Sequence, residues 1–257
     1  MKQDERSQVQ SKSFGEVAEN YDRYRPGPPG DAVEWLLPAN ATDVLDVGAG
    51  TGGLTRQLVT RVPHVRAVEP DARMREVLEE RLAGVEVMDG RGEEIPADDA
   101  SFDAVFMSSA WHWVDEERAV PEMARVLRPG GRLALLWSGP DRSIDWVKSL
   151  FWGGMPVTAE VDEAWRATRR TRHEVNLGEN SPFGEPEAKL FHWTIPMSRD
   201  EALGLVGTFS VAITMDGEQR EHYETGISDF LRQEVSVSAD GTFEMPMRCI
   251  SWRANLR

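Results

Sequence analysis

A glycine-rich stretch constrains the fold of this chain more than any other feature: Asp46-Val47-Gly48-Ala49-Gly50-Thr51-Gly52-Gly53. It directly follows a short apolar run, 44–47, and directly precedes a helix-compatible segment, 54–61. Glycine is needed where backbone turns tightly and approaches a ligand closely, and the N-terminus of a following helix offers free amides. We therefore expect a strand, a loop and a helix that together bind a nucleotide-like ligand.

Apolar runs and helix-compatible segments go on alternating after this loop. The runs are 65–69, 85–88, 102–108 and 132–137, and the helical segments are 72–82 and 117–127. This order predicts right-handed βαβ units, hence an α/β fold with a mostly parallel sheet covered on both faces.

The flanking regions carry weaker local signals. Before the sheet we expect helices over 13–24 and 31–37, the second with Asp31 as its N-cap. After it we expect helices over 145–152, 160–172 and 219–233, and a capping box of Ser198 and Glu201 opening a helix that runs to about residue 208. A strand is expected over 190–195, and a final strand over 243–252, broken at Pro246.

Two acidic residues, one just before the glycines and one at the end of the next strand, narrow the class of ligand. Glu69 ends the next strand, where a carboxylate can accept both hydrogen bonds from a ribose diol. Gly48, Gly50 and Gly53 also satisfy the dinucleotide pattern G-x-G-x-x-G, so the glycines alone leave more than one adenosine cofactor open. Asp46 suits a cationic amino group better than a pyrophosphate, whose negative charge it would repel.

Four ordered motifs resemble those of class I S-adenosylmethionine-dependent methyltransferases. They are Asp46 to Gly52, Glu69-Pro70, Ser101 to Val105 and Arg125 to Gly131. The resemblance implies a Rossmann-like, seven-stranded, mostly parallel sheet with an antiparallel last strand, flanked by helices. It also implies one structural domain in three parts: an N-terminal helical lid (1–41), a core that binds S-adenosylmethionine (42–140), and a substrate-covering insertion that completes the sheet (141–257).

Further segments resemble the small-molecule branch that includes the trans-aconitate methyltransferase-like proteins, with a methyltransferase type 11 domain. They are Ser13-Phe14-Gly15, Tyr21, Arg25-Pro26 and Ala110-Trp111-His112-Trp113. One position departs from the family pattern. Arg91 stands where the family often has an acidic residue that accepts a hydrogen bond from the adenine amino group, and a guanidinium can only donate hydrogen bonds. Asp89 or the backbone of Gly92 are the alternatives for that contact.

The resemblance implies two sets of site residues, and the spacing of His64, His173, His192 and His222 suggests no metal site. In the cofactor set the glycines admit the methionyl part, Asp46 assists its amino group and Glu69 holds the ribose. Met74 either packs on adenine or fills an ordinary apolar helix position, and Arg25 reaches a methionyl or a substrate carboxylate. The cofactor set is Tyr21, Arg25, Asp46, Gly48, Ala49, Gly50, Glu69, Pro70, Met74, Gly92, Glu93, Ser109 and Ala110. The substrate set is Phe14, Trp111, His112, Trp113 and Trp137.

His112 is the one titratable residue that we place at the reaction centre. It follows the fourth strand, in the crevice at the carboxyl ends of the strands where ligands of open α/β sheets bind. A neutral imidazole there could accept a proton from a hydroxyl or thiol nucleophile as a general base. The alternatives are that His112 only orients the substrate, or that it satisfies a backbone carbonyl.

Composition excludes several classes of partner. The 44 Asp and Glu outnumber the 29 Lys and Arg, giving a formal net charge of −15, which argues against binding a nucleic-acid backbone. The single cysteine, Cys249, excludes an intramolecular disulfide and a thiolate zinc cluster. No stretch approaches the ~20 apolar residues that span a bilayer, and no signal peptide is evident, so we expect a cytoplasmic protein without a membrane partner. The oligomeric state is left open.

The sequence as a whole predicts an enzyme that transfers a methyl group from S-adenosylmethionine to a small organic acceptor, with S-adenosylhomocysteine as product. Oxygen is favoured as the methylated atom, nitrogen, carbon and sulfur are alternatives, and secondary metabolism is one setting for the reaction. Two rival hypotheses remain at this point: an NAD-dependent oxidoreductase, and a protein that binds the cofactor without transferring methyl.

Overall fold

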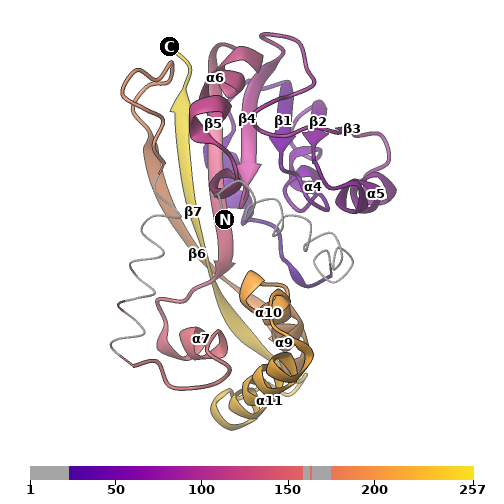
Figure 1. The fold of residues 1–257 in the computed structure, drawn as a ribbon, viewed down its shortest axis with the longest axis vertical. Helices are drawn as coiled ribbons and strands as arrows, with labels where there is room; N and C mark the ends of the chain where they lie inside the picture. The colour runs from indigo at the N-terminus through magenta and orange to yellow at the C-terminus, as the bar shows by residue number, and fades with distance from the viewer. Residues whose placement is uncertain (1–22, 159–162, 164–174) are drawn as a thin grey trace.

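A computed structural model describes residues 23–158, 163 and 175–257 of the chain (Figure 1). The predicted helix over 160–172 lies almost wholly outside the described residues, as does most of the helix over 13–24. Phe14 and Tyr21 lie outside them too.

The described residues form one seven-stranded sheet with the strand order β3-β2-β1-β4-β5-β7-β6. The β1, β2, β3, β4 and β5 strands pair in parallel, whereas β7 pairs antiparallel with both β5 and β6. This confirms the predicted α/β class and its antiparallel last strand. The strands are β1 Asp43–Val47, β2 His64–Val68, β3 Glu86–Met88, β4 Phe102–Ser108, β5 Leu127–Pro140, β6 Glu187–Ser198 and β7 Thr242–Asn255.

The helices follow the predicted alternation with small shifts at their ends. The Ser198 and Glu201 capping box is present at the start of α9 as predicted. The prediction for Asp31 is wrong by two residues, since Pro29 is the N-cap and Asp31 lies in the first turn. The helices are α3 Gly30–Leu36, α4 Thr55–Leu58, α5 Ala72–Arg81, η1 Trp111–Trp113, α6 Glu116–Val126, α7 Asp145–Leu150, α9 Arg199–Gly207, α10 Ser210–Ile213 and α11 Gly217–Glu234.

Alternate side chains of the central strands enter two separate cores. Ala104 and Phe106 of β4 pack with the apolar residues of α3 and α4 on one face of the sheet. Val105 and Met107, one position along, pack with those of α6 on the other face. This period of two is what a strand buried on both faces requires.

A third core lies beyond the carboxyl ends of the parallel strands. It joins α7, α9 and α11 to the ends of β6 and β7 through residues such as Leu150, Leu205, Ile227 and Met245. In Figure 1 these helices form the lower part of the molecule, and β4 and β5 point towards it. The site expected for the ligand, at the carboxyl ends of the parallel strands, therefore lies on the side of the sheet that faces this helical part.

The predicted break of the last strand at Pro246 is wrong. Pro246 stays in register opposite Thr194 of β6, and its carbonyl accepts from the Asp141 N–H at 2.8 Å, on the β5 side. In an extended strand the N and the carbonyl of one residue point to the same side. The N–H that proline lacks would therefore point towards β5, which ends at Pro140, and not towards β6. The hydrogen bonds between β7 and β6 are thus unaffected by the proline.

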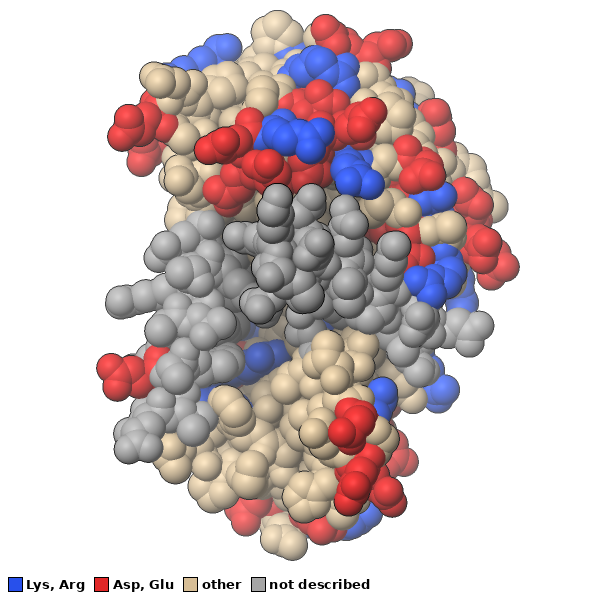
Figure 2. All heavy atoms as spheres, in the orientation of Figure 1, with Lys and Arg blue, Asp and Glu red and all other residues tan. Residues whose placement is uncertain are grey.

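Among the charged side chains visible in Figure 2, acidic ones outnumber basic ones, and Lys and Arg are scattered between them. Among the described atoms of this face there is no broad basic surface. In the part of the chain that the structure describes, no helix has both the length and the apolar character to cross a membrane.

Candidate functional site

The loop after β1 has the backbone that only glycine adopts easily. Gly48 and Gly50 have φ of +68° and +57°. The N–H groups of Gly48 and Ala49 both donate to the Val68 carbonyl, at 2.8 and 3.1 Å, which ties the loop to β2. A Cβ on Gly48 would lie 2.6 Å from Cβ of Ala110, whereas a Cβ on Gly50 would meet nothing within 4 Å. The glycines therefore allow one close approach between loops and leave one open position for a ligand.

Glu69 is buried directly beside that loop. Its Oε2 accepts the Gly50 N–H at 2.9 Å, and its Oε1 accepts the Asp71 N–H at 3.0 Å. Burial raises the pKa of this carboxyl, and these two hydrogen bonds act against the rise. The structure thus brings the predicted ribose acid and the predicted glycine loop into direct contact.

Asp46 is fully buried at the end of β1. Its Oδ2 accepts from the Thr55 hydroxyl at 2.7 Å, while Oδ1 has no hydrogen-bond partner among the described residues. Burial raises the pKa of Asp46 to about 7, and the Glu69 charge adds to the rise. A buried carboxylate oxygen without a partner is costly, and a cationic amino group would satisfy it. Together with the open glycine position, this orphaned oxygen fits the methionyl end of S-adenosylmethionine.

Some of the residues predicted to contact adenine make other contacts in the structure. Met74 is buried in the first turn of α5, and Pro70 is exposed. Glu93 accepts the Asp115 N–H at 2.8 Å, so its carboxylate supports the start of α6. Asp89, the alternative acceptor, pairs with Arg75 at 3.0 Å.

Gly92 is buried, and a Cβ there would lie 2.8 Å from Cγ1 of Val114. Glycine is thus required at this position by packing against the segment after η1.

The loop after β4 carries the strained backbone of the site. Ser109 has a φ of +55°, uncommon for a residue with a side chain, and its N–H donates to the Leu136 carbonyl at 2.7 Å. The positive φ turns the chain so that Ala110 contacts the glycine loop and η1 begins at Trp111. Strain of this kind often accompanies functional loops.

His112 lies in η1 and is half-buried. The Trp137 indole Nε1 donates to His112 Nδ1 at 3.1 Å, and the Trp113 ring lies 4.6 Å from the imidazole, centroid to centroid. Trp111, by contrast, is buried in the core, with its Nε1 donating to Glu116 at 2.9 Å. That position favours a core role for Trp111 over the substrate contact we expected.

Arg25 lies against the C-terminal helices. Its Nε donates to the Thr208 hydroxyl at 2.9 Å, and its guanidinium carbon lies 3.5 Å from the centre of the Phe209 ring. Arg142 stacks on the same Phe209 at 4.7 Å and on Phe151 at 3.4 Å. Two residues after Arg25, a Cβ on Gly27 would lie 2.7 Å from the carbonyl oxygen of Gly53, so this segment joins the glycine loop to the helical part.

These contacts show which residues the sequence analysis missed. Thr208, Phe209 and the aromatic partners of Arg142 carry no motif, because they meet the N-terminal segment only through the tertiary fold. The one sequence feature that could have pointed to this cluster is Arg142, an arginine just after the end of the long central strand β5.

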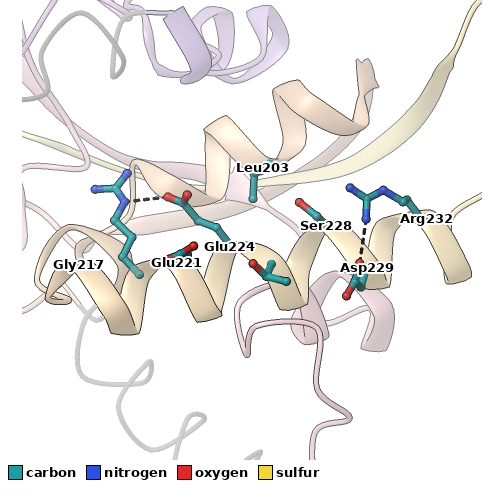
Figure 3. Close-up of a pocket in the computed structure, with 9 residues that line it drawn as sticks. Leu203, Gly217, Glu221, Glu224, Ser228, Asp229 and Arg232 are labelled. Carbon is teal, nitrogen blue, oxygen red and sulfur yellow. Dashed lines mark hydrogen bonds and ion pairs between the residues drawn. The ribbon is translucent and has the colours of Figure 1, made fainter.

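A separate groove of about 410 Å³ lies on α9 and α11 (Figure 3). Four of its charged side chains pair along α11, Arg220 with Glu224 and Arg232 with Asp229. None of the predicted site residues lines it, so we do not assign it to the reaction.

Comparison with known proteins agrees with this geometry. Residues 45–135 match the model of a family described as a methyltransferase domain. The chain is 39% identical to an uncharacterized methyltransferase of Mycobacterium tuberculosis over 246 residues, 96% of each chain.

Solved structures share the fold. A candidate type II methyltransferase from Anaeromyxobacter dehalogenans matches with a TM-score of 0.64 at 24% identity, over 90% of this chain and 97% of that one. A phosphoethanolamine N-methyltransferase 2 of Haemonchus contortus matches with a TM-score of 0.55 at 17% identity, over 95% of this chain and 57% of that one.

The relative that spans nearly the whole chain settles the family, and the seven-stranded sheet with its glycine loop agrees with it. The prediction of a methyltransferase is confirmed over its two rivals, with S-adenosylmethionine as cofactor and S-adenosylhomocysteine as product. The chain belongs to the class I S-adenosylmethionine-dependent methyltransferases.

Proposed function

We propose that this enzyme methylates a small organic acceptor, at an oxygen atom, in the crevice between the glycine loop and the C-terminal helices. The observation that carries the proposal is the contact of Glu69 with Gly50, beside the orphaned oxygen of Asp46. S-adenosylmethionine supplies an electrophilic methyl group on a sulfonium, so the protein mainly has to bind, align and exclude water.

The residues of this chain divide that work between them. Asp46 receives the methionyl amino group, Glu69 receives the ribose hydroxyls, and Gly48, Ala49 and Gly50 let the backbone approach. Met74, Pro70, Gly92, Glu93, Ser109 and Ala110 border the rest of the cofactor. We assign residues 141–257 to covering the acceptor and residues 1–41 to a lid; residues 1–22, 159–162 and 164–174 of these ranges lie outside the part of the chain that the structure describes.

A small acceptor is favoured by the surroundings of the crevice. In the helical part, the rings of Phe151 and Phe209 pack edge to face and the Arg142 guanidinium stacks on both, and we place the acceptor beside this group. The acidic surface would repel a polyanion such as nucleic acid. The Haemonchus contortus neighbour is in complex with phosphomonomethylethanolamine and S-adenosylhomocysteine, which supports a small acceptor only through the shared fold. A cytoplasmic location and a place in secondary metabolism belong to the same proposal.

Two measurements test the proposal. Calorimetry with S-adenosylhomocysteine should give submillimolar binding, and no heat at high ligand concentration would contradict it. A screen of small alcohols, phenols, acids and amines with S-adenosylmethionine should then give a product heavier by one methyl group. Fragmentation of that product locates the methylated atom, and methylation of nitrogen, carbon or sulfur would correct the choice of oxygen.

A further inference from the structure

The hydrogen bond between Trp137 and His112 determines which nitrogen of the neutral imidazole carries the proton. An indole N–H only donates, so at 3.1 Å from Trp137 Nε1 the His112 Nδ1 must be the nitrogen with the lone pair. In a neutral imidazole the proton then resides on Nε2. His112 in this tautomer offers an N–H from Nε2 and has no lone pair there to accept a proton.

Packing keeps the donor in place. Trp137 is only 7% exposed and belongs to the core formed with α6, on the same face of β5 as Leu133 and Leu135. The opposite tautomer would bring two N–H groups face to face and leave a buried indole donor unsatisfied, which is unfavourable. His112 is anchored on its own side as well, since Ala110, two residues earlier, contacts Gly48.

We propose that Trp137 is a positioning residue, which holds His112 as a hydrogen-bond donor to the methyl acceptor, so that the nucleophilic atom of the acceptor arrives already unprotonated. The inference rests on the proposed function and replaces the general-base role considered for His112. An unprotonated acceptor atom forms its bond to the methyl carbon with its own lone pair, while the carbon–sulfur bonding pair stays with sulfur. No proton is transferred in that step, so no base is required.

The neighbouring residues favour an ionised oxygen as that atom. Gly139 lies two residues beyond Trp137 and therefore faces the same side of β5. A Cβ on Gly139 would lie 3.8 Å from Cζ of Phe209, the ring on which Arg25 and Arg142 stack. The imidazole donor and two guanidinium groups thus share one side of the strand. The class of acceptor that this suits is an oxygen acid ionised near neutral pH, rather than an alcohol.

The tautomer can be measured without knowing the acceptor. The full-length protein, labelled with ¹⁵N-histidine and saturated with S-adenosylhomocysteine, is examined by NMR across pH, with His112→Gln to assign the signals. We expect neutral His112 to show a proton on Nε2 and a lone pair on Nδ1. Trp137→Phe keeps a ring in the core but removes the donor, and should shift His112 to a mixture of tautomers while the other four histidines are unchanged. A proton on Nδ1 in the wild type would overturn the proposal.

Turnover of the acceptor identified by product mass separates donor from base. His112→Gln keeps an N–H donor near the position of Nε2 and cannot act as a base, so we expect it to retain turnover within about threefold, whereas His112→Ala falls roughly tenfold or more. His64→Gln, an exposed histidine on β2, is the matched control. Equal losses in His112→Gln and His112→Ala would support a base and overturn the inference. Failure to bind S-adenosylhomocysteine would instead refute the proposed function, so the two failures are distinguishable.

Discussion

The backbone N–H of Gly50 donates a 2.9 Å hydrogen bond to the Glu69 carboxylate, and this contact joins the loop after β1 to the end of β2. The second carboxylate oxygen takes the Asp71 N–H. Each oxygen retains a second lone pair, which a ribose hydroxyl can use. Glu69 therefore shapes the loop as well as offering the ribose its acceptors, so its removal should affect both.

Glu69→Ala should weaken S-adenosylhomocysteine binding by about 2–3 kcal/mol, because two charge-assisted hydrogen bonds to the ribose are lost and the Gly50 amide loses its partner. Glu69→Gln should also weaken binding, since its amide keeps one acceptor oxygen but places an NH2 group against the N–H of Gly50 or of Asp71. Calorimetry measures both affinities. Glu79→Ala, an exposed carboxylate of α5, is the control and should bind like the wild type. Equal affinities for the wild type and Glu69→Ala would remove Glu69 from the cofactor site.

Asp46 should make the stability of the cofactor-free protein fall with rising pH. Burial raises the pKa of this carboxyl from 3.8 to about 7. Between those values the folded state holds a proton that the unfolded state has released, so unfolding becomes easier as pH increases. The full effect is of order 4 kcal/mol at most. Asp46→Asn removes it, so urea unfolding should show the variant gaining stability relative to the wild type from pH 4 to pH 8, and a constant difference would contradict this account.

Binding of the cofactor should release the same proton. A cationic amino group beside Asp46 favours the carboxylate and lowers its pKa. Calorimetry of S-adenosylhomocysteine near pH 6.5, in two buffers with different ionisation enthalpies, should therefore show proton release in the wild type. Asp46→Asn should bind more weakly and show less release. Identical proton release in both proteins would place the amino group elsewhere.

Gly50 and Gly84 form a matched pair for testing the ligand-facing loop. Both have positive φ, +57° and +103°, and a Cβ on either would meet nothing within 4 Å. Replacement by Ala should thus cost Gly50→Ala about 1–2 kcal/mol of stability from backbone strain, and Gly84→Ala at least as much, because its φ lies outside the left-handed region that alanine can adopt. Only Gly50→Ala adds a methyl group where the cofactor approaches, so only this variant should lose affinity for S-adenosylhomocysteine. A similar loss in Gly84→Ala would mean that stability, not contact, governs binding.

Local signals explain why much of the fold could be predicted. The strand β4 was expected with its observed bounds, because its alternating residues are apolar on both faces and turn residues flank it. The capping box at Ser198 and Glu201 needs only residues three apart, and its geometry is present as expected. Asp46, Gly50 and Glu69 could be grouped because consecutive parallel strands end at the same edge of the sheet.

The remaining features depend on contacts that the sequence does not encode locally. Pro246 looked like a break because nothing nearby reveals that β5 ends beside it. Trp137 and His112 lie in contact because β4 and β5 are neighbours in the sheet. The hydrogen bond that sets the His112 tautomer therefore depends on the tertiary fold and has no local sequence signal. Trp111 and Trp113 are alike in sequence, yet one enters the core and the other lies against His112.

Thr208 offers a test of the link between the N-terminal segment and the C-terminal helices. Its hydroxyl donates to the Leu205 carbonyl at 2.6 Å and accepts from Arg25 Nε at 2.9 Å. Thr60 has the same local bond, donating to Gln57 at 2.8 Å, but is exposed. Thr208→Val should lower the free energy of unfolding by about 1.5–3 kcal/mol, because a hydrogen bond from a guanidinium is lost in a buried place, whereas Thr60→Val should change it by less than about 0.5 kcal/mol. Urea unfolding measures both, and equal effects would show that Arg25 contributes nothing through Thr208.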